Sequence, residues 1–377
     1  MTEQVRMVWL DALRLIAGVS MVGLHATADS MGQPFAAFET SERIAPMLLR
    51  AVIYTARTEL FLIISVFLLL LALETRPKTY AAVMRIQARR LLVPFAFWTL
   101  FYAAYNLIKA ETFGYAAPYI DQLSKPFEWF GFFLLGDVKY HMHFIPTLFG
   151  LLLFYPLFRL AQQFPMIGLM VLACLAAKRE MDVFVWSTFW GQEGLPYLVR
   201  GVKILTYCGY GMVAGAALGI WQQVEPAVRR QWFVLIAFVG AMLFLIKLIA
   251  TYKTIETAQW QHGFTPGYWA DFLMPVVLFM GCLCLGHLRW PSVISKWAPY
   301  SFGIYLCHPI FLDVSEILLR GTAWPPIAQV GFKIAVAIPL TTALVVLLSR
   351  NSVLGWTVGM GHLPRVPGFN KLKVKGI

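Results

Sequence analysis

Arg14 and His25 lie on one face of a hydrophobic segment that reads W-L-D-A-L-R-L-I-A-G-V-S-M-V-G-L-H from Trp9. Helical residues turn by about 100° each, so the eleven-residue step returns His25 to within about 20° of Arg14. Asp11 shares this face. An imidazole exchanges protons near neutral pH, and a guanidinium binds anions. The stripe, about 16 Å long, predicts a polar site. The alternative is an Asp11–Arg14 pair at a membrane edge and a histidine packed in the core.

The composition indicates the class of protein that positions this stripe. The chain has 377 residues, of which 59% are hydrophobic and 13% charged, and its mean hydropathy is +0.67. These values exclude a soluble globule and predict an all-α polytopic integral membrane protein. We expect about ten transmembrane helices, because runs near the bilayer-spanning length of about 20 residues recur throughout. They lie near 9–28, 46–73, 91–109, 143–158, 166–177, 197–220, 232–250, 268–286, 299–319 and 327–348.

The basic residues predict the orientation of these helices. Of the 31 Lys and Arg residues, 16 fall on one side of the ten-span arrangement and 8 on the other. The positive-inside rule then places both termini in the cytoplasm. The net charge of +12 therefore reflects topology and contact with the lipid bilayer, and we expect no nucleic-acid partner. Residues 1–377 form one membrane domain in this interpretation, with 349–377 as a basic cytoplasmic tail.

Two other features argue against processing and cross-linking. Asp11 and Arg14 interrupt the apolar run that a cleaved signal peptide needs, so we expect the first helix to be retained. The five cysteines all fall within or at the ends of predicted spans. They are interpreted as packing residues rather than disulfide or metal ligands.

A predicted cytoplasmic loop carries Arg85 and Arg89 at helical spacing, with Arg90 beside them. Guanidinium groups match phosphate geometry, so these residues suit a multiply phosphorylated ligand. Anchoring to lipid headgroups is the alternative, and spacing alone favours it.

Two longer loops on the opposite side hold many aromatic and polar residues, among them His141, His143, Trp269 and Asp271. Aromatic faces mixed with carboxylates suit a carbohydrate, although an interfacial aromatic belt is the commoner explanation. The pair His141-x-His143 would need further ligands to hold a metal, and we expect no metal site.

Depth along the helices brings some of these groups together. Counted from the cytoplasmic side, His25 lies about 26 Å deep, Arg57 about 24 Å and Glu59 about 21 Å. These three side chains are predicted neighbours in the outer half of the membrane, where Arg200 also enters from the outer end of its span. Such charges need a wet, polar cavity, which a transporter would have as readily as an enzyme.

Several segments resemble the acyltransferase 3 family in order along nearly the whole chain. The first helix has the Arg and His of the family signature, and Y-S-F-G-I-Y-L-C-H-P follows from Tyr300. Two residues depart from the family pattern: Val66 replaces a Gly, and His143 stands where Trp is frequent. The other matching segments are E-L-F-L-I-I-S-V-F-L-L from Glu59, R-I-Q-A-R-R-L-L-V-P-F from Arg85, Y-H-M-H-F-I-P-T-L-F-G-L from Tyr140 and L-T-Y-C-G-Y-G-M-V-A-G from Leu205.

The resemblance implies membrane-embedded O-acyl transfer in the bacterial inner membrane. The donor would be a cytoplasmic acyl-CoA, acetyl-CoA or succinyl-CoA, used as a substrate and not as a tightly bound cofactor. The acceptor would be a hydroxyl of an exported or periplasmic polysaccharide or lipid-linked glycan. Polysaccharide synthase or export proteins are the expected partners.

Under this resemblance the site residues take distinct roles. His25 is the expected base, Glu59 orients its imidazole and Arg57 stabilises the oxyanion. The donor would be held by Asp11, Arg14, Arg85, Arg89 and Arg90, and the acceptor by His141, His143, Arg200, Trp269 and Asp271. His308 is a second candidate base, although its place before Pro309 favours a structural role at a helix kink.

Two other classes of function remain open. A polytopic transporter would be expected to contain inverted repeats, and the sequence reveals none. A non-catalytic subunit of a polysaccharide synthesis or export machinery would not need the Arg14–His25 stripe.

Overall fold

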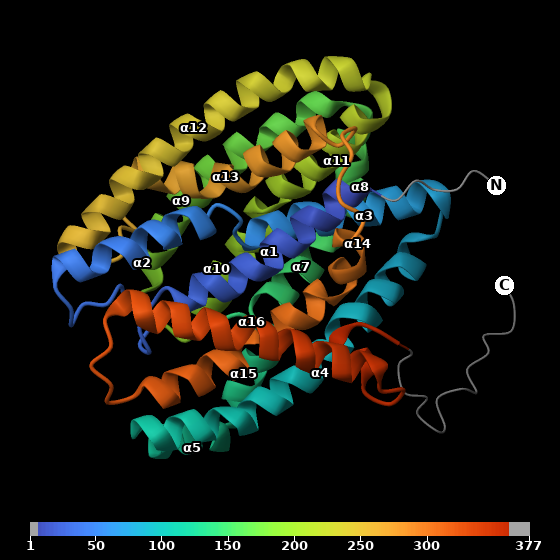
Figure 1. Ribbon diagram of the computed structural model, residues 1–377. Helices are drawn as coiled ribbons and strands as arrows, with labels where there is room; N and C mark the ends of the chain where they lie inside the picture. The colour runs from blue at the N-terminus through green and yellow to red at the C-terminus, as the bar shows by residue number, and fades with distance from the viewer. Residues whose placement is uncertain (1–6, 362–377) are drawn as a thin grey trace, which may run out of the picture.

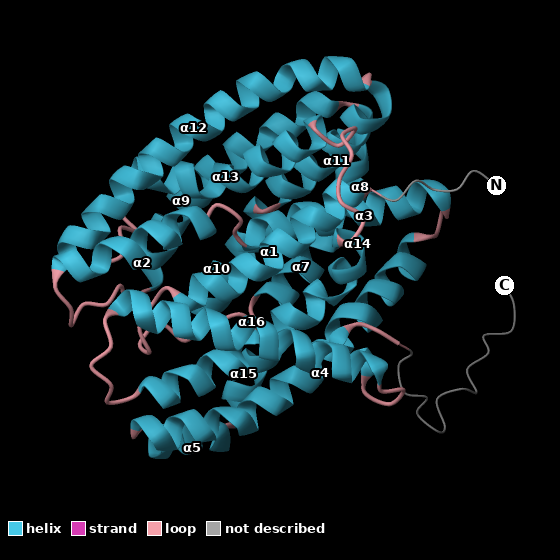
Figure 2. Cartoon of the chain, viewed as in Figure 1, coloured by secondary structure: helices cyan, strands magenta, loops and turns pink. Residues whose placement is uncertain are grey.

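The computed structural model describes residues 7–361, which form a bundle of helices (Figures 1 and 2). The α-helices are α1 Val8–Ala26, α2 Thr40–Ile53, α3 Thr58–Thr75, α4 Tyr80–Phe113, α5 Ala116–Ser124, α6 Pro126–Leu134, α7 Phe144–Leu152, α8 Tyr155–Gln163, α9 Met170–Phe189, α10 Leu195–Thr206, α11 Cys208–Gln223, α12 Pro226–Thr257, α13 Thr265–Cys284, α14 Ile294–Trp297, α15 Ser301–Leu319 and α16 Pro326–Arg350. Short 3₁₀ helices occupy Pro165–Leu169 (η1), Ala298–Tyr300 (η2) and Gly355–Val358 (η3).

Eight helical segments within the described residues are long and apolar enough to cross a membrane. The number rises to nine if α7 and α8 form one bent span. The described residues thus supply eight or nine candidates for the predicted ten or so spans, and the exact number is not confirmed. The predicted span at 166–177 is not among them, because it falls on η1 and the start of α9, and α9 does not qualify. Its middle carries K-R-E-M-D from Lys178, which lowers its hydropathy.

The predicted span at 143–158 is bent rather than straight. Helices α7 and α8 meet at an angle of 63°. Pro156 lies at the start of α8, where the missing N–H and fixed φ of proline suit the beginning of a new helix. The turn between the two helices thereby places α7 against α3 and lets α8 pack along α11.

Glycines on α11 let α8 approach it closely. A Cβ added at Gly215 would lie 2.0 Å from the carbonyl oxygen of Phe158, and one at Gly219 would lie 2.1 Å from that of Gln162. No larger side chain fits at either position. Small residues at helix interfaces are a common way to pack membrane helices tightly.

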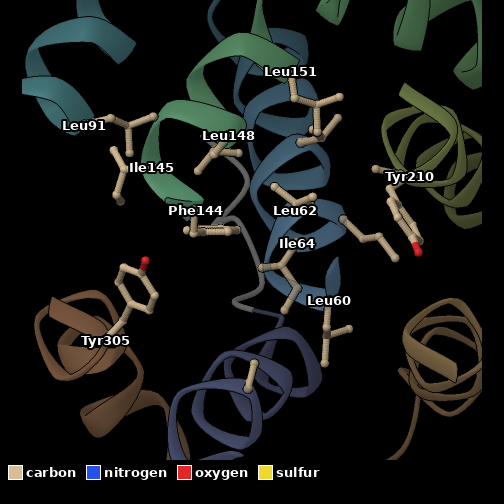
Figure 3. Packing of buried hydrophobic residues seen from close by; sticks show 14 of the residues in the cluster. Leu60, Leu62, Ile64, Leu91, Phe144, Ile145, Leu148, Leu151, Tyr210 and Tyr305 are labelled. Carbon is tan, nitrogen blue, oxygen red and sulfur yellow. The ribbon is translucent and has the colours of Figure 1, made fainter. Parts of the chain in front are cut away.

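The apolar side chains fall into a central set and a lipid-facing set. Leu60, Leu62 and Ile64 of α3 lie between α7 and α11 in Figure 3 and are buried. By contrast, only 6% of the apolar window of α12 is buried, and its Val234 and Leu235 are exposed. In a bilayer those side chains would contact lipid tails, so α12 is a peripheral span.

Buried ion pairs join the helices that surround the centre. Asp313 of α15 forms ion pairs with Lys109 of α4, at 3.0 Å, and with Lys139, at 2.6 Å. The side chain of Asp313 is 1% exposed. Glu316, one turn later, binds Lys109 at 2.5 Å and Lys333 of α16 at 3.6 Å. Charges buried at this depth are stable only when paired in this way.

The connections lie at two ends of the bundle. In Figure 1 the start of α1, the end of α16 and the turn between α3 and α4 lie at one end. Helix α5 and the connection from α12 to α13 lie at the other end. The start of α1 and the end of α16 thus lie at the same end of the bundle, and the cytoplasmic placement of the termini stays a prediction from the charge distribution.

Single cysteines test that orientation. In a background without the five native cysteines, a membrane-impermeant thiol reagent added outside whole cells should label Gln122→Cys and Gln261→Cys. The same reagent should label Lys78→Cys only after the cells are broken, and Lys373→Cys, beyond the described residues, should behave in the same way. Labelling of Gln122→Cys and Lys78→Cys from the same side would contradict the arrangement.

Removing one charge tests the buried ion pairs. The change Asp313→Asn leaves Lys109 and Lys139 with an uncompensated charge, so we expect it to destabilise the fold by about 3 kcal/mol or more and to lower the apparent Tm by about 5 °C. Thermal unfolding in detergent measures this. Asp121→Asn removes an exposed partner of Lys125 and serves as the control. An Asp313→Asn protein as stable as this control would contradict the interpretation.

Candidate active site

Three histidines and a tyrosine gather where α1, α15 and the segment before α7 meet. We define this histidine cluster as His25, Tyr140, His141 and His308. The ring centroid of His25 lies 4.1 Å from that of Tyr140 and 5.6 Å from that of His308. The rings of His141 and His308 are 5.1 Å apart. The cluster therefore joins three segments that are distant in sequence.

Pro309 explains how His308 is oriented. A proline inside a helix provides no N–H for the carbonyl four residues earlier. That carbonyl belongs to Tyr305, and the Nδ1 of His308 lies 2.7 Å from its oxygen. Since a carbonyl only accepts, the proton is on Nδ1 and the lone pair is on Nε2. The structural role predicted for His308 at the proline thus leaves its Nε2 able to accept a proton.

Several ring nitrogens of the cluster are buried without a hydrogen-bond partner among residues 7–361. They are Nε2 of His25, Nε2 of His308 and both ring nitrogens of His141. Buried polar atoms are rarely left unpaired, and such exceptions occur at functional sites. His25 is half-buried, whereas His308 is 0% exposed. His25 is therefore the more accessible of the two.

The segment 136–143 is held in place by contacts on both sides. Gly136 has a φ of 72°, and an added Cβ would lie 2.7 Å from the carbonyl oxygen of Met142. The Tyr305 hydroxyl donates to the carbonyl of His141, and Figure 3 shows this hydroxyl directed toward the start of α7. Lys139 is fixed by Asp313. These contacts set the position of Tyr140 and His141.

The Arg14 cavity is lined by residues of α1, α3, α4, α7 and α15. It has a volume of about 160 Å³, and Arg14, Arg90 and Tyr305 are among its lining residues. Asp11 lies 3.7 Å from Arg14 and accepts a hydrogen bond from Ser295 at 2.7 Å. Tyr305 also contacts His141, so this one residue links the cavity lining to the histidine cluster, whose four members do not line the cavity themselves.

The other predicted basic residues lie outside this cavity. Arg85 and Arg89 are exposed on the first turns of α4. They are not part of its lining. The start of α4, which carries them, lies at the end of the bundle where α1 begins (Figure 1).

Glu59 and Arg57 form an ion cluster of their own. Arg57 Nε lies 3.2 Å from Glu59 Oε2, and Nη2 lies 3.3 Å from Oε1. The Tyr207 hydroxyl donates to Oε1 at 2.7 Å, and Thr58 donates to Oε2 at 3.3 Å. Donors other than His25 thus occupy both carboxylate oxygens. Of the three residues predicted to be neighbours, Arg57 and Glu59 therefore belong to this ion cluster, whereas His25 belongs to the histidine cluster.

A second space, the Arg50 cavity, lies beside this ion cluster. Its volume is about 350 Å³. Arg50 donates from Nη1 to the carbonyl of Leu24 at 2.5 Å and lies close to Thr27 Oγ1, at 3.3 Å. Arg50, one of its lining residues, thereby contacts the last turn of α1, which carries His25, while the lining itself includes no residue of α1. Asp271, a predicted acceptor residue, lines it.

The remaining predicted acceptor residues have different surroundings. Arg200 donates to the carbonyl of His143 and to Thr147 Oγ1, so it holds the start of α7. Trp269 packs against the hydrophobic core. His141 belongs to the histidine cluster. Among the described residues, no set of three or more His, Cys, Asp or Glu side chains is arranged to hold a metal ion.

Sequence reasoning missed the roles of Tyr140 and Arg50. Tyr140 appears in the Y-H-M-H segment, in which roles were predicted only for the two histidines. Arg50 is a cation inside a predicted span, and such residues face a cavity or a partner. That signal could have identified it.

Comparison with known proteins bears on the identity of this site. A family model described as an acyltransferase domain, that of the acyltransferase 3 family, matches residues 7–349. Neither a search of curated proteins nor one of solved structures found a match. The family match confirms the resemblance predicted from the motifs and covers every residue of the histidine cluster. The chain therefore belongs to the acyltransferase 3 family and is a multi-pass membrane acyltransferase.

Proposed function

We propose that the protein transfers an acetyl or succinyl group from cytoplasmic acyl-CoA to a hydroxyl of an exported or periplasmic polysaccharide. The site of action is the bacterial inner membrane, where polysaccharide synthase or export proteins deliver a polysaccharide or lipid-linked glycan. Acyl-CoA is a substrate and leaves as free CoA. The proposal builds on the family and on two cavities whose lining residues Tyr305 and Arg50 contact the segments that carry the histidines.

One observation carries the proposal. Each of the two cavities is linked to the histidine cluster through one lining residue, and Nε2 of His25 and Nε2 of His308 are unpaired among residues 7–361. Tyr305 lines the Arg14 cavity and contacts His141, and Arg50 lines the Arg50 cavity and binds the last turn of α1, which carries His25. A donor and an acceptor that enter by different routes could therefore meet at one base.

The Arg14 cavity suits the donor. Arg14 and Arg90 offer two guanidinium groups to a phosphorylated ligand, and Asp11 fixes the first of them. Arg85 and Arg89 lie nearer water and would attract the nucleotide end. A phosphopantetheine arm would then extend along the cavity toward Tyr305 and bring the thioester to the cluster.

The reaction needs one base that later returns its proton. His25 Nε2 removes the proton of the acceptor hydroxyl while its oxygen bonds to the thioester carbon. The tetrahedral intermediate then expels the CoA thiolate, which takes that proton from the imidazolium. His308, stacked on His25, stabilises the charged ring as a neutral partner. Since Glu59 and Asp271 already hold Arg57, we assign Arg57 to the wall of the Arg50 cavity and Glu59 to its support behind that wall.

Replacing His25 tests the base. We expect His25→Ala to lower kcat at least 100-fold, because a positioned base contributes about that factor or more, while donor affinity changes little. Radiolabel transfer from acyl-CoA to glycan measures kcat. His287, exposed after α13, provides the control variant His287→Ala, which should keep normal turnover. Near-normal turnover in His25→Ala would overturn this assignment.

Replacing the cavity arginines tests the donor site. Arg14→Gln and Arg90→Gln should each weaken CoA binding about tenfold, the value of one charge-assisted hydrogen bond. Arg85→Gln and Arg89→Gln should have smaller effects that vanish at high salt. Equilibrium binding of a CoA analogue measures this, with Arg159→Gln as an exposed control. Equal losses for Arg14→Gln and His25→Ala would argue against separate donor and base positions.

A further inference from the structure

The Arg50 cavity is rich in cations. Three Lys or Arg side chains and His262 line it, while a single carboxylate, that of Asp271, lies among its lining residues. The lining residues used below are Arg50, Tyr54, Arg57, Lys247, Trp260 and Asp271. Cations at membrane depth are costly unless they are paired or face an anion or water.

Two of these three cations have carboxylate partners, and Arg50 has none among the described residues. Lys247 is paired with Asp271. Arg57 is paired with Glu59, and its Nη1 lies 3.6 Å from Asp271. Arg50 forms no ion pair with any residue in 7–361 and binds only the neutral oxygens of α1. The lining and its neighbour Glu59 thus have one positive charge in excess, and it is on Arg50.

Arg50 is held as a rigid recognition group. Its Cζ lies 4.2 Å from the ring centroid of Trp260 and 5.4 Å from that of Tyr54. Its two hydrogen bonds to the end of α1 fix the direction of the guanidinium. A preorganised guanidinium loses less entropy on binding and suits the paired oxygens of a carboxylate or phosphate.

The break between α2 and α3 adds to the positive potential. Helix α3 begins at Thr58, with Arg57 as its N-cap residue. The N-terminal turn of a helix carries a partial positive charge. This turn lies beside the cavity, because Tyr54 and Arg57, on either side of the break, both line it.

We propose that the Arg50 cavity binds an anionic group, a carboxylate or a phosphate, of the acceptor. The anion-binding part of this inference stands on the cavity itself, and the identification of its owner as the acceptor rests on the proposed function. Because Arg50 binds the carbonyl of Leu24, an acid group on Arg50 lies next to the turn that carries His25. The acceptor would then be an acidic glycan, with a hydroxyl near the base.

A binding experiment tests the anion site without turnover. Purified protein in nanodiscs is titrated with methyl glucuronide, glucose 6-phosphate and methyl glucoside, and saturation-transfer NMR gives the affinities. At least one charged sugar should bind about tenfold more tightly than methyl glucoside, since a hydrogen bond to a charged group is worth about that factor. The tighter of the two identifies carboxylate or phosphate as the preferred group. Equal affinities for all three sugars would overturn the proposal.

Matched variants locate the effect. Arg50→Gln should remove the preference for the charged sugar, and Arg50→Lys should retain part of it. Lys253→Gln removes a cation from the exposed surface near the end of α12, outside the cavity lining, and should keep the full preference. Unchanged CoA binding verifies that each variant is folded. A preference that survives in Arg50→Gln, or that Lys253→Gln also abolishes, would overturn the proposal.

A turnover experiment tests whether the anion belongs to the acceptor. Acidic polysaccharide fragments and the same fragments after reduction of their carboxyl groups are offered with radiolabelled acetyl-CoA or succinyl-CoA. The native fragments should receive about tenfold more label. Equal labelling of both pools would show that the acceptor does not use an acid group. Absence of label from both pools counts against the proposed function, and the binding ratio still decides the anion site.

Discussion

The loss of one backbone hydrogen bond at Pro309 organises the centre of this protein. Proline leaves the carbonyl of Tyr305 without its helical donor, and the His308 ring supplies the replacement at 2.7 Å. That bond fixes which nitrogen of His308 carries the proton. It also places the ring against those of His25 and His141. The hydrogen bond that replaces the missing helical one therefore determines which nitrogen of His308 can accept a proton.

Buried ion pairs fix the position of the histidine cluster in an apolar interior, where an unpaired charge is costly. Asp313 lies five residues after His308 on the same helix and binds Lys139, which adjoins Tyr140 in sequence. The same helix therefore positions one histidine directly and the 136–143 segment through an ion pair. Breaking that pair would leave charges unpaired in an apolar interior, which is far more costly than at a water-exposed surface.

Periodicity and depth predicted what lies on one helix better than what lies between helices. The Arg14–His25 stripe follows from helical geometry, and the family follows from motifs spread along the chain. Depth placed His25 and Glu59 at similar heights, but height does not determine which helix faces point toward each other. Glu59 therefore binds Arg57 and Tyr207, while His25 lies against Tyr140 and His308. The sequence contains Pro156 and the charged residues of α9. The lengths of the apolar runs alone nevertheless led to straight spans being predicted at 143–158 and 166–177.

The proposed function uses two cavities that are linked to the histidine cluster through Tyr305 and Arg50, and in it donor and acceptor need not share a side of the membrane. Proteoliposomes with uniformly oriented protein test this most directly, with radiolabelled acyl-CoA on one side and acceptor glycan on the other. The account predicts label in the glycan when the donor is on the side of Lys78 and the acceptor on the side of Gln122. Label that appears only when both substrates are on the same side would contradict it.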